Sequence, residues 1–281
     1  MLSTLAPRIG FELVTVPIAP GAAWVEDDDF VAAWDERVAL AVVTLVSSTS
    51  SHRVDLARLA AHGRASGSLV AVDFTQAAGI LPLDVREPAV DFAAATVLKW
   101  LCGVPGAGFA YVAPELVAAA RPTLAGWFSQ PNPFNWDLDK FALAGDARRF
   151  DHGTPSYLPY VASLPGLRDA AAADRAARLA SNQAICERIV AVVDAHGLAL
   201  CSPREAERRG GSVMFVAPES CPAPDLVAHL ETHGIHTDCR GDRVRASPGP
   251  AATVDVVEAL DRALGDVASG RPAAGGQARH A

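Results

Sequence analysis

The feature that most constrains the fold is the segment 38–46, VALAVVTLV, a continuous run of apolar and mostly β-branched residues. Such a run is typical of a strand buried on both faces of a parallel sheet. It is followed by a small polar loop at 47–51, a helical pattern at 55–65 and a second strand pattern, SLVAVD, at 68–73. The order strand, loop, helix, strand predicts a βαβ unit and an α/β fold with a mostly parallel sheet.

Other patterns extend this organisation. We expect strands at 11–18, 92–96 and 108–112, a long aromatic-rich connection at 124–150, and one long helix at 166–196. The segments beyond alternate between strand and helix patterns, as in a small α+β domain. The predicted domains are therefore a large domain (1–165), an interdomain helix (166–196), a small α+β domain (197–267) and a disordered tail (268–281) that lacks core-forming residues.

Composition excludes several classes of protein. The 281 residues are 50% hydrophobic, enough to bury a full core, and the net charge of −8 argues against nucleic acid or an anionic membrane as the main partner. The five cysteines are odd in number and widely spaced, which predicts free thiols in a reducing compartment and no metal site. No targeting segment or apolar run of membrane-spanning length is evident, so we expect a cytoplasmic protein acting on a small molecule.

One lysine stands inside an apolar run. The chain has only two lysines, Lys99 and Lys140, and Lys99 lies within DFAAATVLKWLCGVPGAGFAYV. A buried ammonium is costly unless it is paired, depressed in pKa or covalently modified, and a lysine amine can act as a nucleophile. The alternative is a lysine with a buried stem and a solvated head at a strand end. The run alone does not decide between these roles.

Three polar residues stand at offsets that suit a lysine-bound cofactor. Asp73 closes a predicted strand, Gln76 follows three residues later, and Thr96 precedes Lys99 by three. A carboxylate, an amide and a hydroxyl could hold a protonated ring nitrogen, a phenolate and a phosphate. Each also has an ordinary explanation: a turn cap, a surface amide and a β-branched strand residue.

Together these residues resemble a known family. The order strand–Asp73–x–x–Gln76, then Thr96–x–x–Lys99 with a Gly/Pro-rich turn and a strand, is similar to the fold-type I pyridoxal-phosphate enzymes of the class V aminotransferase superfamily. LAGWFSQPNPFNWD (124–137) resembles the Gly-Trp segment of kynureninases, and RRFDHGTPSYLPYVASLPGL (148–167) the Phe-x-x-Gly-Thr-Pro segment of the group. The kynureninase-like branch fits best. The resemblance implies a three-layer sandwich with a mostly parallel sheet as the large, cofactor-binding domain, plus the small domain.

The resemblance also implies roles for the residues. Lys99 would hold pyridoxal 5′-phosphate as a Schiff base and shuttle the substrate α-proton. Asp73 would hold the pyridinium, Gln76 the phenolate and Thr96 a phosphate oxygen. Ser47, at the preceding strand end, is a weaker candidate for the same edge.

Further roles concern the neighbouring subunit and the substrate. In this group the Gly-Trp segment and the Gly-Thr-Pro turn reach the phosphate of the partner subunit, which assigns Trp127 and Thr154 and implies a homodimer. Arg245 would bind the α-carboxylate of an amino acid substrate, and Arg243 and Arg240 are close enough in sequence to leave that choice open. Gln130 stands in the Gly-Trp segment where kynureninases carry a histidine.

The chain departs from the family in two more ways. It matches from about residue 11 onward, so the N-terminal part that carries the phosphate-binding helix and the ring-stacking aromatic is not encoded here. A late start site, a gene remnant or a half-enzyme completed by another chain would each explain this. We therefore expect weak cofactor binding. Leu98 also replaces the polar or aromatic neighbour that relatives place before the lysine.

Several functions remain open on sequence alone. Transamination and Cβ–Cγ hydrolytic cleavage share the same residues. A cysteine desulfurase is disfavoured because Cys239 precedes Arg243 and Arg245 and no cysteine follows them. A different class of function is a truncated homologue that keeps the fold and dimer surface but is catalytically weak or inactive.

Overall fold

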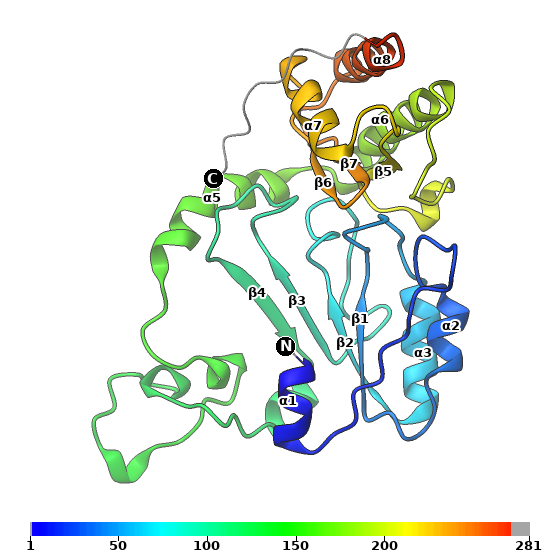
Figure 1. Ribbon diagram of the computed structural model, residues 1–281. Coiled ribbons are helices and arrows are strands. Elements are labelled where there is room, and N and C mark those ends of the chain that lie inside the picture. The colour runs from blue at the N-terminus through cyan, green and yellow to red at the C-terminus, as the bar shows by residue number, and fades with distance from the viewer. Residues whose placement is uncertain (1, 271–281) are drawn as a thin grey trace.

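The computed structural model describes residues 2–270, apart from the side chain at position 138. Its larger sheet has the strand order β1 (Leu40–Thr44), β2 (Leu69–Asp73), β3 (Phe92–Thr96) and β4 (Gly108–Val112). The first three strands are parallel and β4 is antiparallel to β3, as Figure 1 shows. The predicted α/β fold with a mostly parallel sheet is confirmed.

Helices cover one face of this sheet. α2 (Asp27–Ala32) and α3 (Leu56–Ser66) lie beside β1 and β2 (Figure 1), and the core between them contains Trp34, Leu59, Val43, Val70 and Val72. α3 begins at an Asp55 cap, whose side chain accepts from the Arg58 amide, and ends at Gly67 with φ 70°. These local signals explain why a helix forms between the two strands.

The opposite face of the sheet is open among the described residues. Leu40 and Val42 of β1 are 50% and 47% exposed, and Leu69 and Phe92 are also exposed. The expectation that the run 38–46 is buried on both faces is therefore wrong for the chain as described. Alternate residues of the run point to opposite faces, and only the inward set meets α2 and α3.

The predicted strand at 11–18 is also wrong. After α1 (Leu2–Ile9) the chain runs through residues 11–19 without joining a strand. The alternating pattern is present, but a strand needs a neighbour for its backbone hydrogen bonds, and none lies beside this segment among residues 2–270.

Between the sheet and the small domain the chain is largely irregular. α4 (Pro114–Ala119) is followed by the 3-10 turns η1 (Trp127–Ser129), η2 (Leu138–Lys140) and η3 (Ala147–Phe150). Buried Arg149 fixes this connection: its guanidinium donates to the carbonyls of Val117, Ala118 at 3.3 Å, Ala120 at 3.1 Å and Ala144 at 2.8 Å. One arginine thus ties the end of α4 to the end of the connection.

The predicted single helix at 166–196 is two helices. α5 (Tyr157–Ala172) ends where Ala173 turns extended, and α6 (Arg175–Ala195) begins at Asp174, whose carboxylate accepts from the amides of Ala176 and Ala177 at 3.0 and 3.1 Å. The capping carboxylate competes with helix continuation, which explains the break.

The C-terminal part has a core of its own. β5 (Val213–Val216), β7 (Arg243–Ala246) and β6 (Asp238–Arg240) form an antiparallel sheet in the order β5-β7-β6. α6, α7 (Ala223–Thr232) and α8 (Val254–Ala268) pack on it, and the turn η4 (Ala206–Arg208) precedes β5. This agrees with an α+β unit. Of the predicted tail at 268–281, residues 271–281 lie outside the described part of the chain. No described helix combines the length and apolar character needed to cross a membrane.

Candidate functional site

Lys99 follows β3 in a tight turn. The Cys102 amide donates to the Lys99 carbonyl at 2.9 Å, and the Gly103 amide donates to the Val97 carbonyl at 2.8 Å. A side chain at Gly103 would stand 2.6 Å from Val97 Cγ2 and 2.7 Å from Ser163 Oγ, so the turn packs closely against α5. The close approach explains why glycine follows the lysine here.

Trp100 anchors the same turn. Its side chain is buried, and its ring lies so close to Gly211 that a Cβ there would stand 2.7 Å from it. On the other side its backbone approaches Gly79, where a Cβ would stand 2.7 Å from the Trp100 carbonyl carbon. Sequence reasoning missed this residue, although a large aromatic directly after the lysine was a visible signal. Trp100 fixes the backbone, while Lys99 and Leu98 are exposed.

The Lys99 ammonium has no hydrogen-bond or ion-pair partner within residues 2–270. This differs from a structural surface lysine such as Lys140, whose Nζ lies 2.7 Å from Asp137 Oδ2. Lys99 is therefore an accessible amine on a rigid turn. That combination suits covalent attachment of a carbonyl compound.

Asp73 and Thr96 lie on the open face at the carboxyl edge of the sheet. β2 and β3 are paired so that Asp73 aligns with Ala94, and Thr96 lies two residues further along the same face. One Asp73 oxygen accepts from the Thr75 amide at 2.8 Å, as in an ordinary turn cap. Thr96 Oγ1 donates to the Ala107 carbonyl at 3.2 Å and accepts from the Leu98 amide at 3.3 Å. Ligands of parallel sheets bind at this edge.

Gln76 and Ser47 flank this edge. Gln76 is half-buried, and its amide has no partner among the described residues. Ser47 Oγ accepts from the amides of Thr49 and Ser50, both at 3.2 Å, and so shapes its own loop after β1. The structure therefore brings Lys99, Asp73, Gln76 and Thr96 to one edge, with Ser47 on the neighbouring loop.

A stacked aromatic pair beside that loop was not predicted. His52 stacks on Trp24 with ring centroids 5.3 Å apart and planes 7° apart. Burial lowers the pKa of His52 below its ordinary value of 6.5, and nearby Arg208 lowers it further, against the opposing effect of Asp27 and Glu26. The contacts join residues far apart in sequence, so no local pattern could have revealed them.

The candidate arginines occupy different surroundings. Arg243 and Arg245 share one face of β7, but Arg245 donates through Nε to Asp238 Oδ1 at 2.8 Å and through Nη2 to Asp238 Oδ2. Arg243 instead reaches the carbonyls of Ala23 at 3.3 Å and Thr49 at 3.5 Å, beside the Ser47 loop. Arg240 is exposed and also pairs with Asp238, at 3.0 Å.

Trp127, Gln130 and Thr154 lie together in the irregular connection, which Figure 1 shows extending away from the sheet. Trp127 contacts Phe128, Phe134 and Trp136, and the Phe128 amide donates to the His152 carbonyl at 3.1 Å. Gln130 is buried and accepts from Asn135 Nδ2 at 3.4 Å, whereas Thr154 is exposed. The two segments meet each other, and no hydrogen bond or ring contact within residues 2–270 joins either of them to Lys99, Asp73 or Gln76.

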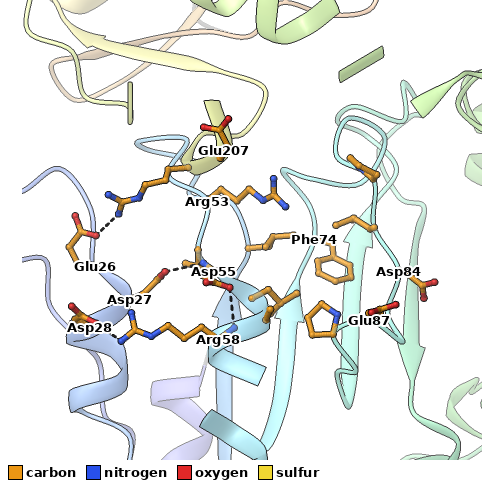
Figure 2. A pocket seen from close by; sticks show the side chains of 18 residues that line it. Glu26, Asp27, Asp28, Arg53, Asp55, Arg58, Phe74, Asp84, Glu87 and Glu207 are labelled. Atoms are coloured by element: carbon orange, nitrogen blue, oxygen red, sulfur yellow. Dashed lines mark hydrogen bonds and ion pairs between the residues drawn. The ribbon is translucent and has the colours of Figure 1, made fainter. Parts of the chain in front are cut away.

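A cavity of about 930 Å³ lies elsewhere, on the side of the sheet that carries α2 and α3. Figure 2 shows Glu26, Asp27 and Asp28 on one side of it, Asp84 and Glu87 on the other, and Arg53 and Phe74 between them. None of Lys99, Asp73, Gln76 or Thr96 lines it. We place the candidate site at Lys99 because reactive groups, not cavity size, determine chemistry.

Comparison with known proteins decides the family. The profile of the family described as "Aminotransferase class-V" matches residues 2–256, most of the chain. The chain belongs to the class V aminotransferase family. The prediction that the chain belongs to this pyridoxal-phosphate-dependent family is confirmed.

Individual relatives agree. The chain is 38% identical over 133 residues to an uncharacterized aminotransferase, YcbU, of Bacillus subtilis, covering 47% of this chain and 34% of that protein. It is 27% identical to a kynureninase of Pseudomonas fluorescens, covering 75% and 51%, and 28% identical to a kynureninase of Deinococcus radiodurans, covering 87% and 62%. The chain thus spans between about a third and two thirds of these relatives.

Solved structures confirm the fold. An apo cysteine desulfurase from Thermococcus onnurineus has a TM-score of 0.85 at 21% identity, covering 96% of this chain and 69% of that one. The chain therefore shares the fold of this desulfurase, and likeness at this identity says nothing about which reaction the chain performs.

Proposed function

We propose that the chain holds pyridoxal phosphate on Lys99 and acts at the α-carbon of an amino acid, by transamination or by Cβ–Cγ hydrolytic cleavage. The observation that carries the proposal is the unpartnered, exposed Lys99 amine at the same sheet edge as Asp73. When bound, the cofactor supplies an electron sink for the bond broken at the substrate.

The residues at this edge have hydrogen-bonding groups that could hold the cofactor. Asp73 uses one carboxylate oxygen for the Thr75 amide, which leaves the other for a protonated ring nitrogen. Gln76 has its amide available to donate to a phenolate oxygen, and the Thr96 hydroxyl can turn from the Ala107 carbonyl to a phosphate oxygen. Lys99 takes up and returns the α-proton of the substrate as an amine base. Ser47 orders the loop beside them.

The substrate carboxylate requires an arginine. We propose Arg245 or Arg243 for this role, with Arg240 less suited because it points to solvent. Arg245 is pre-oriented by Asp238 but shares its guanidinium fork with that carboxylate, whereas Arg243 faces the loop that carries Ser47. The Arg→Lys variants separate them: the variant at the binding residue raises KM by about tenfold or more, because one hydrogen bond to a charged group is lost.

Either reaction class has support from relatives. Kynureninases match most of this chain, which favours Cβ–Cγ cleavage of an amino acid with an aromatic side chain. The aminotransferase of Bacillus subtilis is more similar over a shorter stretch. Cleavage releases alanine, since Cβ becomes a methyl group, whereas transamination releases a 2-oxo acid. Quantifying both products from one amino acid panel distinguishes the two.

We further propose a homodimer. Large apolar side chains of the connection and of α5 are exposed, among them Trp136 at 71% and Leu158 at 81%. Exposed apolar side chains of this size are typical of an interaction surface, and we propose that pairing there brings Trp127 and Thr154 to the partner's cofactor. Sedimentation of Leu158→Glu should show a monomer, while Val14→Glu, at an exposed position outside the connection and α5, should match the wild type. An unchanged dimer in Leu158→Glu would contradict this surface.

The cofactor proposal is tested by titration. The purified chain is incubated with pyridoxal phosphate and dialysed, and its visible absorption is compared with that of Lys99→Ala and Lys140→Ala. The wild type and Lys140→Ala should keep the band of a lysine-bound cofactor, and Lys99→Ala should lose it. Retention of the band by Lys99→Ala would refute the assignment.

A second candidate is a homologue that keeps the fold and dimer surface but is catalytically weak or inactive. It is favoured by the openness of the site: Asp73 and Lys99 are exposed and the sheet face beside them is uncovered. Each charge-assisted hydrogen bond that solvent replaces costs about 1.5–3 kcal/mol, so cofactor affinity falls steeply. A wild-type chain without a band after dialysis supports this candidate and refutes the first.

A further inference from the structure

A second cluster of reactive side chains lies in the C-terminal unit, where α7 packs on α8 at the end of the molecule opposite to the open sheet (Figure 1). His229 and His233 are four residues apart on and just after α7, and Asp266 lies on α8. A spacing of four places both imidazoles on one side of the helix. None of the three belongs to the Lys99 edge.

Their geometry approaches that of a metal site. One ring nitrogen of each histidine and one oxygen of Asp266 lie within 4.8 Å of one another. His233 Nε2 is 3.4 Å from Asp266 Oδ2. In a tetrahedral zinc site with bonds of 2.0–2.1 Å, neighbouring ligand atoms are roughly 3.3 Å apart. This pair is therefore already at coordinating separation.

Backbone carbonyls orient both imidazole rings. His229 Nε2 lies 3.1 Å from the Ala263 carbonyl, and His233 Nδ1 lies 3.2 Å from the His229 carbonyl. A carbonyl only accepts, so the ring nitrogen is the donor in each of these contacts. Metal-binding histidines have this arrangement, with one N–H donated to a carbonyl that orients the ring.

Other histidine–carboxylate pairs in the described chain lack a third member. His196 pairs with Asp261 at 2.8 Å, and His236 lies 3.8 Å from Glu231. Within residues 2–270, His229, His233 and Asp266 form the one group of three potential ligands. An ion pair between His233 and Asp266 would explain their contact, but it would not require the buried imidazole of His229 beside them.

We propose that His229, His233 and Asp266 bind a divalent transition-metal ion, best Zn²⁺, with water as the fourth ligand. Two imidazoles and a carboxylate suit this ion in tetrahedral geometry. The ion would join α7 to α8 and stabilise the C-terminal unit. The proposal does not depend on the function proposed for Lys99. It departs from the expectation of no metal site, which rested on cysteine spacing and did not consider the His-x-x-x-His pattern.

The test uses the full, tag-free chain, freed of metal with a chelator and titrated with Zn²⁺ by calorimetry and with Co²⁺ by visible absorption. His233→Gln and Asp266→Asn are the main variants, because both side chains reach the surface, and His236→Gln is the matched control. We expect one ion per chain in the wild type and control, and at least about tenfold weaker binding in both variants. Zn²⁺ should also raise the Tm of the wild type but not that of His233→Gln.

Two results would overturn the proposal. One is the absence of saturable binding in the wild type. The other is equal affinity in wild type, His233→Gln and Asp266→Asn, which would assign the ion to other groups such as the cysteines. If a variant proves unstable, its metal-free unfolding curve shows this separately, and the remaining variant carries the test.

Discussion

The packing of Gly79 against the Lys99 turn makes a quantitative prediction. Gly79 has φ +100°, and a Cβ there would stand 2.7 Å and 2.8 Å from the carbonyl carbon and oxygen of Trp100 and 3.0 Å from the Leu101 amide nitrogen. These are backbone atoms, so no side-chain rotation relieves the overlap. In Gly79→Ala the turn that carries Lys99 must therefore move.

The magnitude follows from two contributions. A left-handed conformation costs an L-residue about 1–2 kcal/mol, and overpacking costs about 1–3 kcal/mol more. Gly79→Ala should thus lower the free energy of unfolding by about 2–5 kcal/mol. Gly67→Ala is the matched control because Gly67 has φ +70° but nothing within 4 Å, so only the first contribution of about 1–2 kcal/mol applies.

Urea unfolding followed by tryptophan fluorescence measures both variants, and cofactor retention after dialysis measures the site. Gly79→Ala should lose more stability and more cofactor than Gly67→Ala. Equal losses of stability, with equal cofactor retention, would refute the view that Gly79 and Trp100 together position Lys99.

Three further predictions concern burial. Exposed Cys102 should react with a thiol reagent in the native chain. Burial raises the pKa of Cys186 to about 12, so Cys186 should react only after unfolding, and labelling of Cys186 in the native chain, detected by peptide mapping, would contradict this. Burial holds the pKa of His52 below 6.5, so below about pH 6.5 the unfolded chain binds more protons than the folded chain and the free energy of unfolding falls. Between about pH 7 and about pH 5, the wild type should therefore lose stability more steeply than His52→Gln. Parallel stability profiles of the two proteins would count against this prediction. Arg149→Met should lower the free energy of unfolding in urea by about 2–4 kcal/mol, because buried carbonyls lose their donor. The exposed control Arg148→Met should lower it by about 0.5 kcal/mol. Similar losses in both variants would disprove the role of Arg149 in fixing the connection.

Local patterns predicted the strands well but not their surroundings. The segments 92–96 and 108–112 are β3 and β4, and β1 lies within the run 38–46. The expected burial of the run 38–46 on both faces was wrong, because whether a second layer covers the sheet depends on segments distant in sequence and not on the run itself. The segment 11–18 alternates correctly yet finds no partner strand among the described residues. The break between α5 and α6 had a visible signal in Asp174, a residue type that caps helices. The prediction of one continuous helix gave more weight to the helix-forming alanines on both sides of it.

The candidate site was predictable where it depends on strand ends. Asp73 and Thr96 come together because β2 and β3 are adjacent and parallel, which the βαβ pattern implies. The arginines show the limit: Arg243 and Arg245 have the same alternation, and only tertiary contacts distinguish their surroundings. Trp100 directly follows Lys99 in sequence, but its role as an anchor was missed because its packing partner Gly211 is distant in sequence.

We propose that Lys99 is the residue that holds pyridoxal phosphate. Borohydride reduction of the chain with the cofactor, followed by peptide mass mapping, tests it directly because reduction fixes the cofactor on the amine that bound it. We expect the added pyridoxyl mass on the peptide containing Lys99 and none on the peptide containing Lys140. Equal labelling of both lysines, or labelling of Lys140 alone, would contradict it.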